Sequence, residues 1–267
     1  IIDLEKEYDC INQSCGSSFL RREALKENPF NRKLIISEDA DVVYTVLLEK
    51  GKLGVVNGCK YLYRRRSSGE PSAVQSSVRK REYYLDHMQY FVIKKINECL
   101  DKKGVVPNYI QYMLLYDIQW RFNNVLTESN VLNSTEKKYY KQLLHTALQK
   151  IDDKYIEEQE SINAFQKIKL LEIKRKSLLP KLYDPGEIRI YSNEKTLFCF
   201  SYLETVIEFI EIKNDMLYLE GYTTMLDVTD PEECEVELLI NDKAVSSVHV
   251  NRYQNNIWMD EYVSFCL

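Results

Sequence analysis

The sequence lacks any apolar run that approaches the roughly 20 residues with which a helix crosses a bilayer. No secretory signal stands at its start, which reads IIDLEKEYD. No initiator Met precedes these residues, and we therefore expect the chain to be a piece of a longer protein. The remaining interpretation is a globular chain of 267 residues, which is long enough for two or three domains.

The cysteines and histidines form no pattern that indicates a metal site. Seven cysteines, an odd number, stand at positions 10, 15, 59, 99, 199, 234 and 266, and no two have C-x-x-C spacing. This pattern predicts reduced, mostly buried thiols in a cytosolic protein rather than a disulfide framework or a zinc site. His87, His145 and His249 lie far apart, and we expect a structural role for each. We expect no metal ion or other cofactor in this chain.

The sequence also lacks an excess of basic residues. It has 36 Lys and Arg against 41 Asp and Glu, which gives a net charge of -5. Binding to a phosphate backbone requires a basic face, so this balance argues against a nucleic-acid partner.

The first 70 residues or so mix helix and strand signals. Residues 38–50 are typical of a helix, with Ser37 as the expected N-cap and Gly51 as the expected C-cap. KLGVV (52–56) and KYLYRRR (60–66) predict short strands around a turn at Asn57-Gly58. We assign 1–73 to one domain.

In the rest of the chain the hydrophobic periodicity changes once, from helical to strand-like. Residues 74 to about 179 have helical periodicity, which Gly104 and Pro107 interrupt, and Asn133 with Glu136 predicts a capping box. Pro180 and Asp184-Pro185-Gly186 are typical of a linker. From 187 the period becomes two, and VIEFIEI with DMLYLEGY and CEVELLI with KAVSSVHV predict antiparallel hairpins. The fold class is therefore α+β, with a helical domain at 74–183 and a small antiparallel β-sandwich at 187–267.

Three stretches contain residues suited to chemistry, although each alone has an ordinary explanation. ISED (36–39) places Glu38 and Asp39 at a helix start, where carboxylates often only stabilise the helix. YLYRRRSSGEPSAVQ (61–75) combines arginines that suit phosphate oxygens with a loop able to close over a ligand, or it is a solvated strand end. SCGSSFLRREAL (14–25) has a glycine that allows close backbone approach, or a chance turn, and we expect Phe19 and Leu20 to be buried.

Together, and in the order in which they stand along the chain, the three stretches resemble the closing part of a family 2 inverting glycosyltransferase with the GT-A fold. The nearest likeness is to bacterial enzymes that build capsular polysaccharide or teichoic-acid-like polymers, and it covers about residues 12–80. The hairpins around LYLEGY resemble a small β-domain found between such transferases and glycerophosphotransferase domains.

The resemblance implies roles for particular residues. Asp39, with Glu38 beside it, takes the place of the catalytic base that accepts a proton from the acceptor hydroxyl. Gly16, Ser17 and Arg21 line the acceptor side. The resemblance places the donor diphosphate near Tyr63, Arg64 and Arg66.

The resemblance also implies partners and a location. The partners are a nucleotide-sugar donor, a glycan or polyol-phosphate acceptor, and Mg²⁺ or Mn²⁺ in the longer protein. The location is the cytoplasm, and the resemblance leaves open whether the protein lies at the inner face of the membrane. The nucleotide-binding half and its Asp-x-Asp metal motif are expected before residue 1, and we expect the isolated chain to be inactive. The alternative is a non-catalytic helical and β module that docks an envelope-polymer enzyme to its partners.

Overall fold

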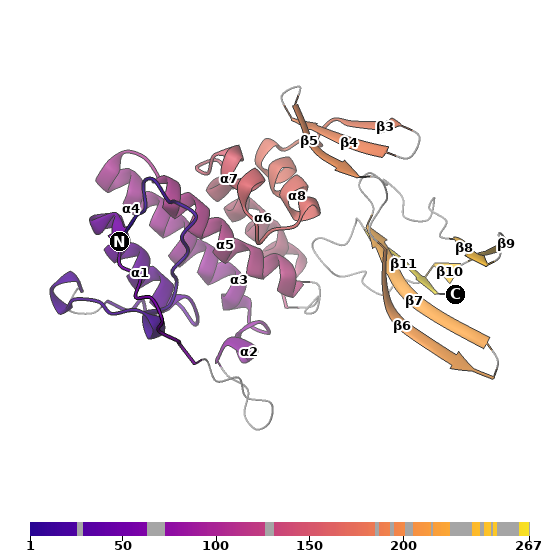
Figure 1. Ribbon diagram of the computed structural model, residues 1–267, viewed down its shortest axis with the longest axis horizontal. Helices are drawn as coiled ribbons and strands as arrows, with labels where there is room; N and C mark the ends of the chain where they lie inside the picture. Colours follow the sequence, from indigo (N-terminus) through magenta and orange to yellow (C-terminus); the bar gives the residue numbers. More distant parts are fainter. Residues whose placement is uncertain are drawn as a thin grey trace. The chain divides into compact units, whose positions relative to one another are not determined.

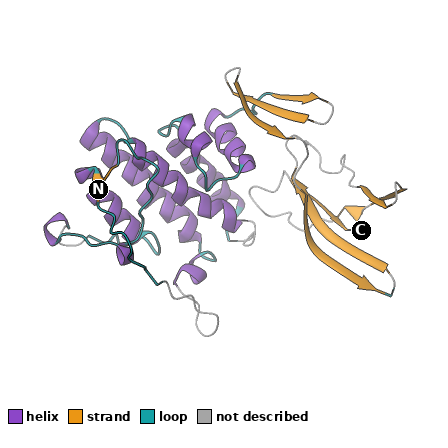
Figure 2. Ribbon diagram, viewed as in Figure 1, coloured by secondary structure: helices purple, strands orange, loops and turns teal. Residues whose placement is uncertain are grey.

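The structure is a computed structural model of the whole chain. It describes residues 1–25, 29–62, 73–125, 131–184, 187–192, 195–200, 205–214, 216–224, 237–240, 243–246, 248–249 and 262–266. Contacts divide the chain into two compact units, of which the first holds Ile1–Asn124 and Val131–Ser177 and the second takes in the chain from Leu178 onward. Helices dominate the first unit and antiparallel sheets make up the second, which confirms the α+β class (Figures 1 and 2).

The first unit is built from helices whose order follows the predicted periodicity. They are α1 Glu38–Lys50, α2 Ala73–Ser77, α3 Arg81–His87, α4 Lys94–Lys103, α5 Asn108–Val125, α6 Ser134–Leu148, α7 Asp153–Glu158 and α8 Ala164–Arg175. A π-helical stretch, Met88–Ile93, joins α3 to α4 without a break. Among the described helices, none combines the length and the apolar character that crossing a bilayer requires.

The helix boundaries follow from identifiable caps. Gly51 and Gly104 end α1 and α4 in the left-handed conformation, with φ of 64° and 72°. The capping box at Asn133 and Glu136 is confirmed, because each side chain accepts a hydrogen bond from the other residue's backbone N–H. A second box, formed by Asn163 and Gln166, begins α8.

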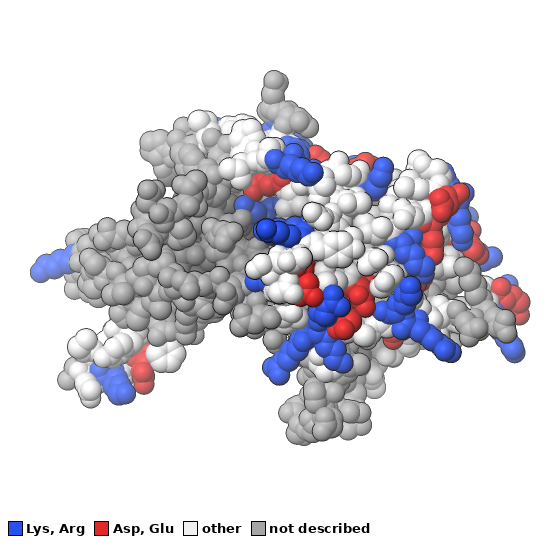
Figure 3. Space-filling model, turned by 180° about the vertical axis from the view of Figure 1, so that it is seen from behind, with Lys and Arg blue, Asp and Glu red and all other residues white. Residues whose placement is uncertain are grey.

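Apolar side chains at helical spacing form the core of the first unit. The fully buried examples include Tyr44, Phe91, Met113, Leu144 and Tyr155. At the surface, basic and acidic side chains of this unit are interspersed on the face that Figure 3 shows. Some of them connect elements, as Arg81 on α3 does with Glu136 on α6.

The strands predicted after α1 are shorter and differently paired than expected. The turn at Asn57-Gly58 is present, but β2 covers only Lys52–Leu53, and residues 60–62 form no strand. The partner of β2 is β1, Ile2–Asp3, in an antiparallel pair. Burial of Leu4, whose N–H donates to the Gly51 carbonyl, holds the first residues beside the end of α1.

The second unit contains antiparallel sheets throughout its described residues. One has the order β3 Lys181–Asp184, β4 Glu187–Ser192 and β5 Lys195–Phe200. Another has the order β10 Val248–His249, β11 Tyr262–Cys266, β7 Met216–Thr224 and β6 Thr205–Lys213. The strands β8 Glu237–Ile240 and β9 Lys243–Ser246 form a separate pair.

The period-two pattern predicted two of these hairpins correctly. The β6–β7 hairpin turns at Asn214, whose φ of 52° lies in the left-handed region that asparagine tolerates. The interpretation of 180–186 as a linker is wrong, because Lys181–Asp184 is a strand paired with Glu187–Ser192. The exposed residues where the two units meet in sequence are Lys176, Ser177 and Leu178 instead.

The left-handed cap at Gly104 gives a stability prediction with a matched control. A Cβ at Gly104 or at Gly54 would meet no atom within 4 Å, but only Gly104 has a positive φ. Gly104→Ala should therefore lower the free energy of unfolding by about 1 kcal/mol. Gly54→Ala should leave it unchanged or raise it by about 0.5 kcal/mol, because alanine restricts the unfolded chain. Urea unfolding of both variants measures the difference, and equal effects would contradict it.

The boundary between the units gives a second prediction. Brief digestion with trypsin should cut first after Lys176, since this residue and the two that follow are exposed. Mass spectrometry should then find a product that ends at residue 176. First cuts within α5 or α6 would show that the boundary lies elsewhere.

Candidate functional site at the head of helix α1

The first turn of α1 contains the predicted catalytic carboxylates, and the residue that precedes this turn has an unusual backbone conformation. Ser37, directly before the helix, has φ of 68° and ψ of 13°, a left-handed conformation that an L-residue with a side chain rarely adopts. Such a conformation costs about 1–2 kcal/mol and persists only where surrounding contacts impose it. The prediction that Ser37 caps the helix with its side chain is wrong, because that side chain makes no capping hydrogen bond.

The Ser37 hydroxyl is directed instead to a buried carboxylate on α5. Its Oγ donates to Oδ1 of Asp117 over 3.3 Å. Oδ1 of Asp117 also accepts from Nη1 of Arg121 at 2.9 Å and from Nε2 of His87 at 3.0 Å. Oδ2 of Asp117 accepts from Nε2 of Gln13 at 2.9 Å. We call these five residues the Asp117 cluster.

The Asp117 cluster connects four segments of the first unit. Gln13 comes from the loop before the SCGSS stretch, Ser37 from the start of α1, His87 from the end of α3, and Asp117 with Arg121 from α5. All except Gln13 are at least nine-tenths buried. A buried polar group without partners is costly, so each hydrogen bond fixes the segment that supplies it. The cluster therefore determines how the chain enters α1.

The charges in the cluster follow from burial and pairing. Burial alone raises the pKa of Asp117, but the hydrogen bond from His87 and the charge of Arg121 outweigh it and hold that pKa below its usual value. Burial and the nearby Arg121 charge lower the pKa of His87 to about 4. His87 is therefore neutral at pH 7, and its Nδ1 is buried with no hydrogen-bond partner among the described residues.

The two carboxylates predicted to be catalytic lie on this support. Glu38 and Asp39 are both half-buried in the first turn of α1. Oδ1 of Asp39 accepts from the backbone N–H of Ala40 at 2.9 Å. The Cys15 thiol donates to the Asp39 carbonyl over 3.4 Å, which places the SCGSS stretch against the helix start.

Gly16 and Ser17 belong to the short helical turn Cys15–Ser17, beside α1, and both are exposed. A Cβ on Gly16 would stand 2.8 Å from Oη of Tyr61, so the Tyr61 side chain lies close against this glycine. Tyr61 of the arginine-bearing stretch thus reaches the SCGSS stretch. Arg21 is exposed and precedes the next turn, Arg22–Ala24. Phe19 is fully exposed, so its expected burial is wrong, and Leu20 is only half-buried.

The predicted diphosphate ligands, Tyr63, Arg64 and Arg66, lie outside the described residues. Within the part of the chain that the structure describes, no three His, Cys, Asp or Glu side chains gather in a way that would hold a metal ion.

The neighbouring acid, Asp41, has a different environment from Asp39. It is buried and forms ion pairs of 2.8 Å with Nζ of both Lys94 and Lys95 on α4. Burial raises its pKa, but the two ammonium groups outweigh burial and lower it overall. The Lys95 ammonium is fully buried and also contacts Glu98 at 2.7 Å. Asp41 therefore joins α1 to α4.

Sequence reasoning missed the residues that support the site, although some left a signal. Asp117 and Arg121 stand four residues apart within YMLLYDIQWRF, an otherwise largely apolar helix. Charged residues on a buried helix face are seldom found unless they are paired. Lys94 and Lys95 interrupt FVIKKI in the same way. Their partners have no comparable signal: His87 on α3 is 30 residues from Asp117, and Asp41 on α1 is 53 residues from Lys94.

The neutral, buried His87 gives a prediction for pH dependence. The unfolded chain binds a proton at His87 near pH 6.5, whereas the folded chain resists protonation down to about pH 4. The contribution of neutral His87 to the free energy of unfolding is therefore fully present above pH 6.5. As the pH decreases from 7.5 to 5, the free energy of unfolding decreases by about 2 kcal/mol. His87→Gln still donates to Asp117 but does not titrate, so its unfolding free energy should fall less over this range. Urea unfolding at both pH values measures it, and parallel losses would contradict the assignment.

Comparisons with known proteins give one similarity and two negative results. The chain is 28% identical over 230 residues to the minor teichoic acid biosynthesis protein GgaB of Bacillus subtilis (strain 168). The match takes in 85% of this chain but only 25% of GgaB, so the chain spans about a quarter of the length of that relative. No family model matches the chain. No solved structure matches it either.

Proposed function

We propose that the chain is part of a glycosyltransferase that builds a teichoic-acid-like polymer of the bacterial cell envelope. The observation that carries the proposal is the convergence at the head of α1. Cys15 and Gly16 of the SCGSS stretch, Asp39 of ISED and Tyr61 of the arginine-bearing stretch meet there. The similarity to a teichoic acid biosynthesis protein over most of the chain supports the same conclusion.

The proposed reaction transfers a sugar from a nucleotide-sugar to a hydroxyl group. Asp39 accepts the proton of the acceptor hydroxyl while the hydroxyl oxygen attacks the anomeric carbon. The bond from that carbon to the diphosphate breaks, and the diphosphate leaves with the electron pair. Inversion follows because the attack and the departure occur on opposite faces of the sugar.

The environment of Asp39 suits this role better than that of Asp41. Asp39 is half-buried, and its only described side-chain hydrogen bond comes from the neighbouring backbone N–H of Ala40. An oxygen that still has lone pairs can accept a proton. Asp41 is committed to two lysines and buried, so it cannot meet an acceptor in the same way.

The remaining roles belong to the same proposal. Glu38 stands beside the base, and Gly16, Ser17 and Arg21 line the acceptor side. Tyr63, Arg64 and Arg66 stabilise the charge of the departing diphosphate. The described residues offer no set of ligands for a divalent ion, so no step is assigned to one. We place the longer protein in the cytoplasm, at the inner face of the membrane, where an envelope polymer is extended.

A second candidate function rests on the second unit. Ile210, Ile212 and Leu217 share one face of the β6–β7 hairpin, and all three are exposed. An exposed apolar face on an antiparallel pair is typical of an interaction surface. This observation favours a non-catalytic module that docks an envelope-polymer enzyme to its partners.

The test of the proposal is Asp39→Asn in the full-length protein. If Asp39 is the base, this isosteric change should lower kcat by about 10²–10⁴ with the donor and acceptor saturating. Melting should change little, because Asn is well tolerated at helix starts. Release of the nucleoside diphosphate from a panel of nucleotide-sugars measures the activity.

Two controls make this test specific. Glu38→Gln should lower kcat less than Asp39→Asn. Asp41→Asn should lower the free energy of unfolding by about 3 kcal/mol, because it removes one of the two carboxylates that neutralise the buried Lys95 ammonium. Full activity in a well-folded Asp39→Asn variant would return Asp39 to a helix-stabilising role and favour the docking module.

A further inference from the structure

A cavity lies along the face of α1 that is turned away from Asp39. Its volume is about 530 Å³, within the range of small-molecule sites. Asp39 and Asp41 are two residues apart, so they point about 200° apart around the helix. Asp41 and Thr45 line the cavity, and Asp39 does not. The cavity is therefore separate from the candidate site at the head of α1.

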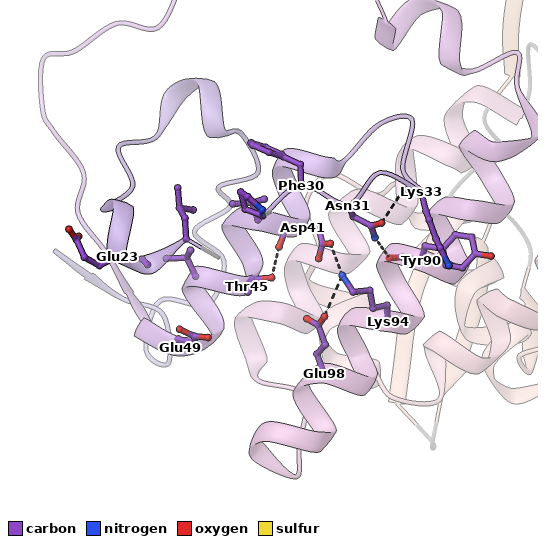
Figure 4. A pocket seen from close by; sticks show the side chains of 15 residues that line it. Glu23, Phe30, Asn31, Lys33, Asp41, Thr45, Glu49, Tyr90, Lys94 and Glu98 are labelled. Carbon is purple, nitrogen blue, oxygen red and sulfur yellow. Dashed lines mark hydrogen bonds and ion pairs between the residues drawn. The ribbon is translucent and has the colours of Figure 1, made fainter. Parts of the chain in front are cut away.

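The walls of the cavity come from three segments. One is α1, another is the stretch 23–33 outside its undescribed residues 26–28, and the third is the π-helical stretch with α4 (Figure 4). Nδ2 of Asn31 donates to the carbonyl of Tyr90 at 3.1 Å, and the Lys33 ammonium lies 4.4 Å from the centre of the Tyr90 ring. These contacts fix one wall to the other. The π-helical turn that presents Tyr90 is a feature frequent at functional sites.

The floor of the cavity is polar and holds one ammonium group and two carboxylates. Lys94 pairs with Asp41 at 2.8 Å and with Glu98 at 3.4 Å, and Figure 4 shows its ammonium between the two carboxylates. The Lys94 side chain is 40% exposed, so its ammonium can still donate to a ligand. The Glu98 carboxylate, which is partly exposed, can accept from a ligand. A group that both donates and accepts, such as a hydroxyl, fits this floor best.

The side chains that line the cavity disfavour both anions and cations. Four acidic residues, Glu23, Asp41, Glu49 and Glu98, line the cavity against two lysines, Lys33 and Lys94, so the lining as a whole repels an anion such as a phosphate. A cation would have to compete with Lys94 for carboxylates that are already paired. Phe30 lines the cavity with 52% of its surface exposed, and its ring offers an apolar face. The C–H face of a sugar ring or a polyol packs on such a surface.

We propose that this cavity binds a neutral, hydroxyl-rich ligand, a sugar unit or a polyol. Hydroxyl groups of the ligand hydrogen-bond to Lys94 and Glu98, and its carbon skeleton packs against Phe30. The inference rests on the cavity and not on the proposed transfer, because binding here involves neither Asp39 nor a donor nucleotide. A failure of one therefore leaves the other intact.

The experiment titrates the 267-residue chain, labelled with ¹⁵N and deuterated, with N-acetylglucosamine, with glycerol and with inorganic phosphate. Amide shifts in two-dimensional spectra report which residues meet each probe. We expect the sugar or glycerol to shift the amides of Phe30, Asn31 and Thr45 in a saturable way, with a Kd of about 1–50 mM. Phosphate should not shift them.

Matched variants test the role of Phe30. Phe30→Ala should weaken sugar binding about fivefold or more. Phe19→Ala removes an equally apolar and fully exposed ring that does not line the cavity, so it should leave binding unchanged. Lys94→Met keeps the packing of the stem but removes the donor, and it should also weaken binding.

Three results would overturn the proposal. One is the absence of saturable shifts at the cavity with every neutral probe, in the folded wild-type chain. Another is a stronger response of the cavity to phosphate than to sugar or glycerol. The third is an equal loss of binding in Phe19→Ala and Phe30→Ala.

Discussion

The buried carboxylate of Asp117 is the interaction on which the first unit depends. A charged group inside a protein is tolerated only when hydrogen bonds and an opposite charge replace the water it has lost. Asp117 meets this requirement with donors from Gln13, Ser37, His87 and Arg121, which brings α1, α3, α5 and the loop before α1 to one point. The same requirement explains why Ser37 is held in a left-handed conformation, since the hydroxyl that a helix cap would use is bonded to Asp117 instead.

A second buried carboxylate fixes α1 on its other side. Asp41 is held by Lys94 and Lys95, so successive acidic residues of one helical turn face different surroundings. Replacing such buried pairs with apolar residues is often neutral or favourable for stability, which makes them weak evidence of stabilisation. Their effect is geometric: a helix with buried charged partners on two sides has little freedom to rotate. This rigidity gives Asp39 a defined position and gives the cavity along Asp41 and Thr45 a defined wall.

The similarity to GgaB and the geometry of the site support each other from different directions. The similarity runs through most of this chain but through only a quarter of the relative. The described residues place a half-buried carboxylate, Asp39, at a fixed helix start, and they place Tyr61 beside Gly16.

The sequence by itself determined the local elements. Period and capping residues predicted α1 between Ser37 and Gly51, the break at Gly104, the box at Asn133, and the β6–β7 hairpin, because these depend on neighbours a few residues apart. Tertiary structure alone decided the rest. The pairing of β2 with β1 and the strand at Lys181–Asp184 depend on partners that periodicity does not identify. The Asp117 cluster and the lysines of Asp41 join residues from 30 to more than 100 positions apart, and only burial reveals them. A sequence shows which side chains need partners, whereas the packing of helices decides which partners they find.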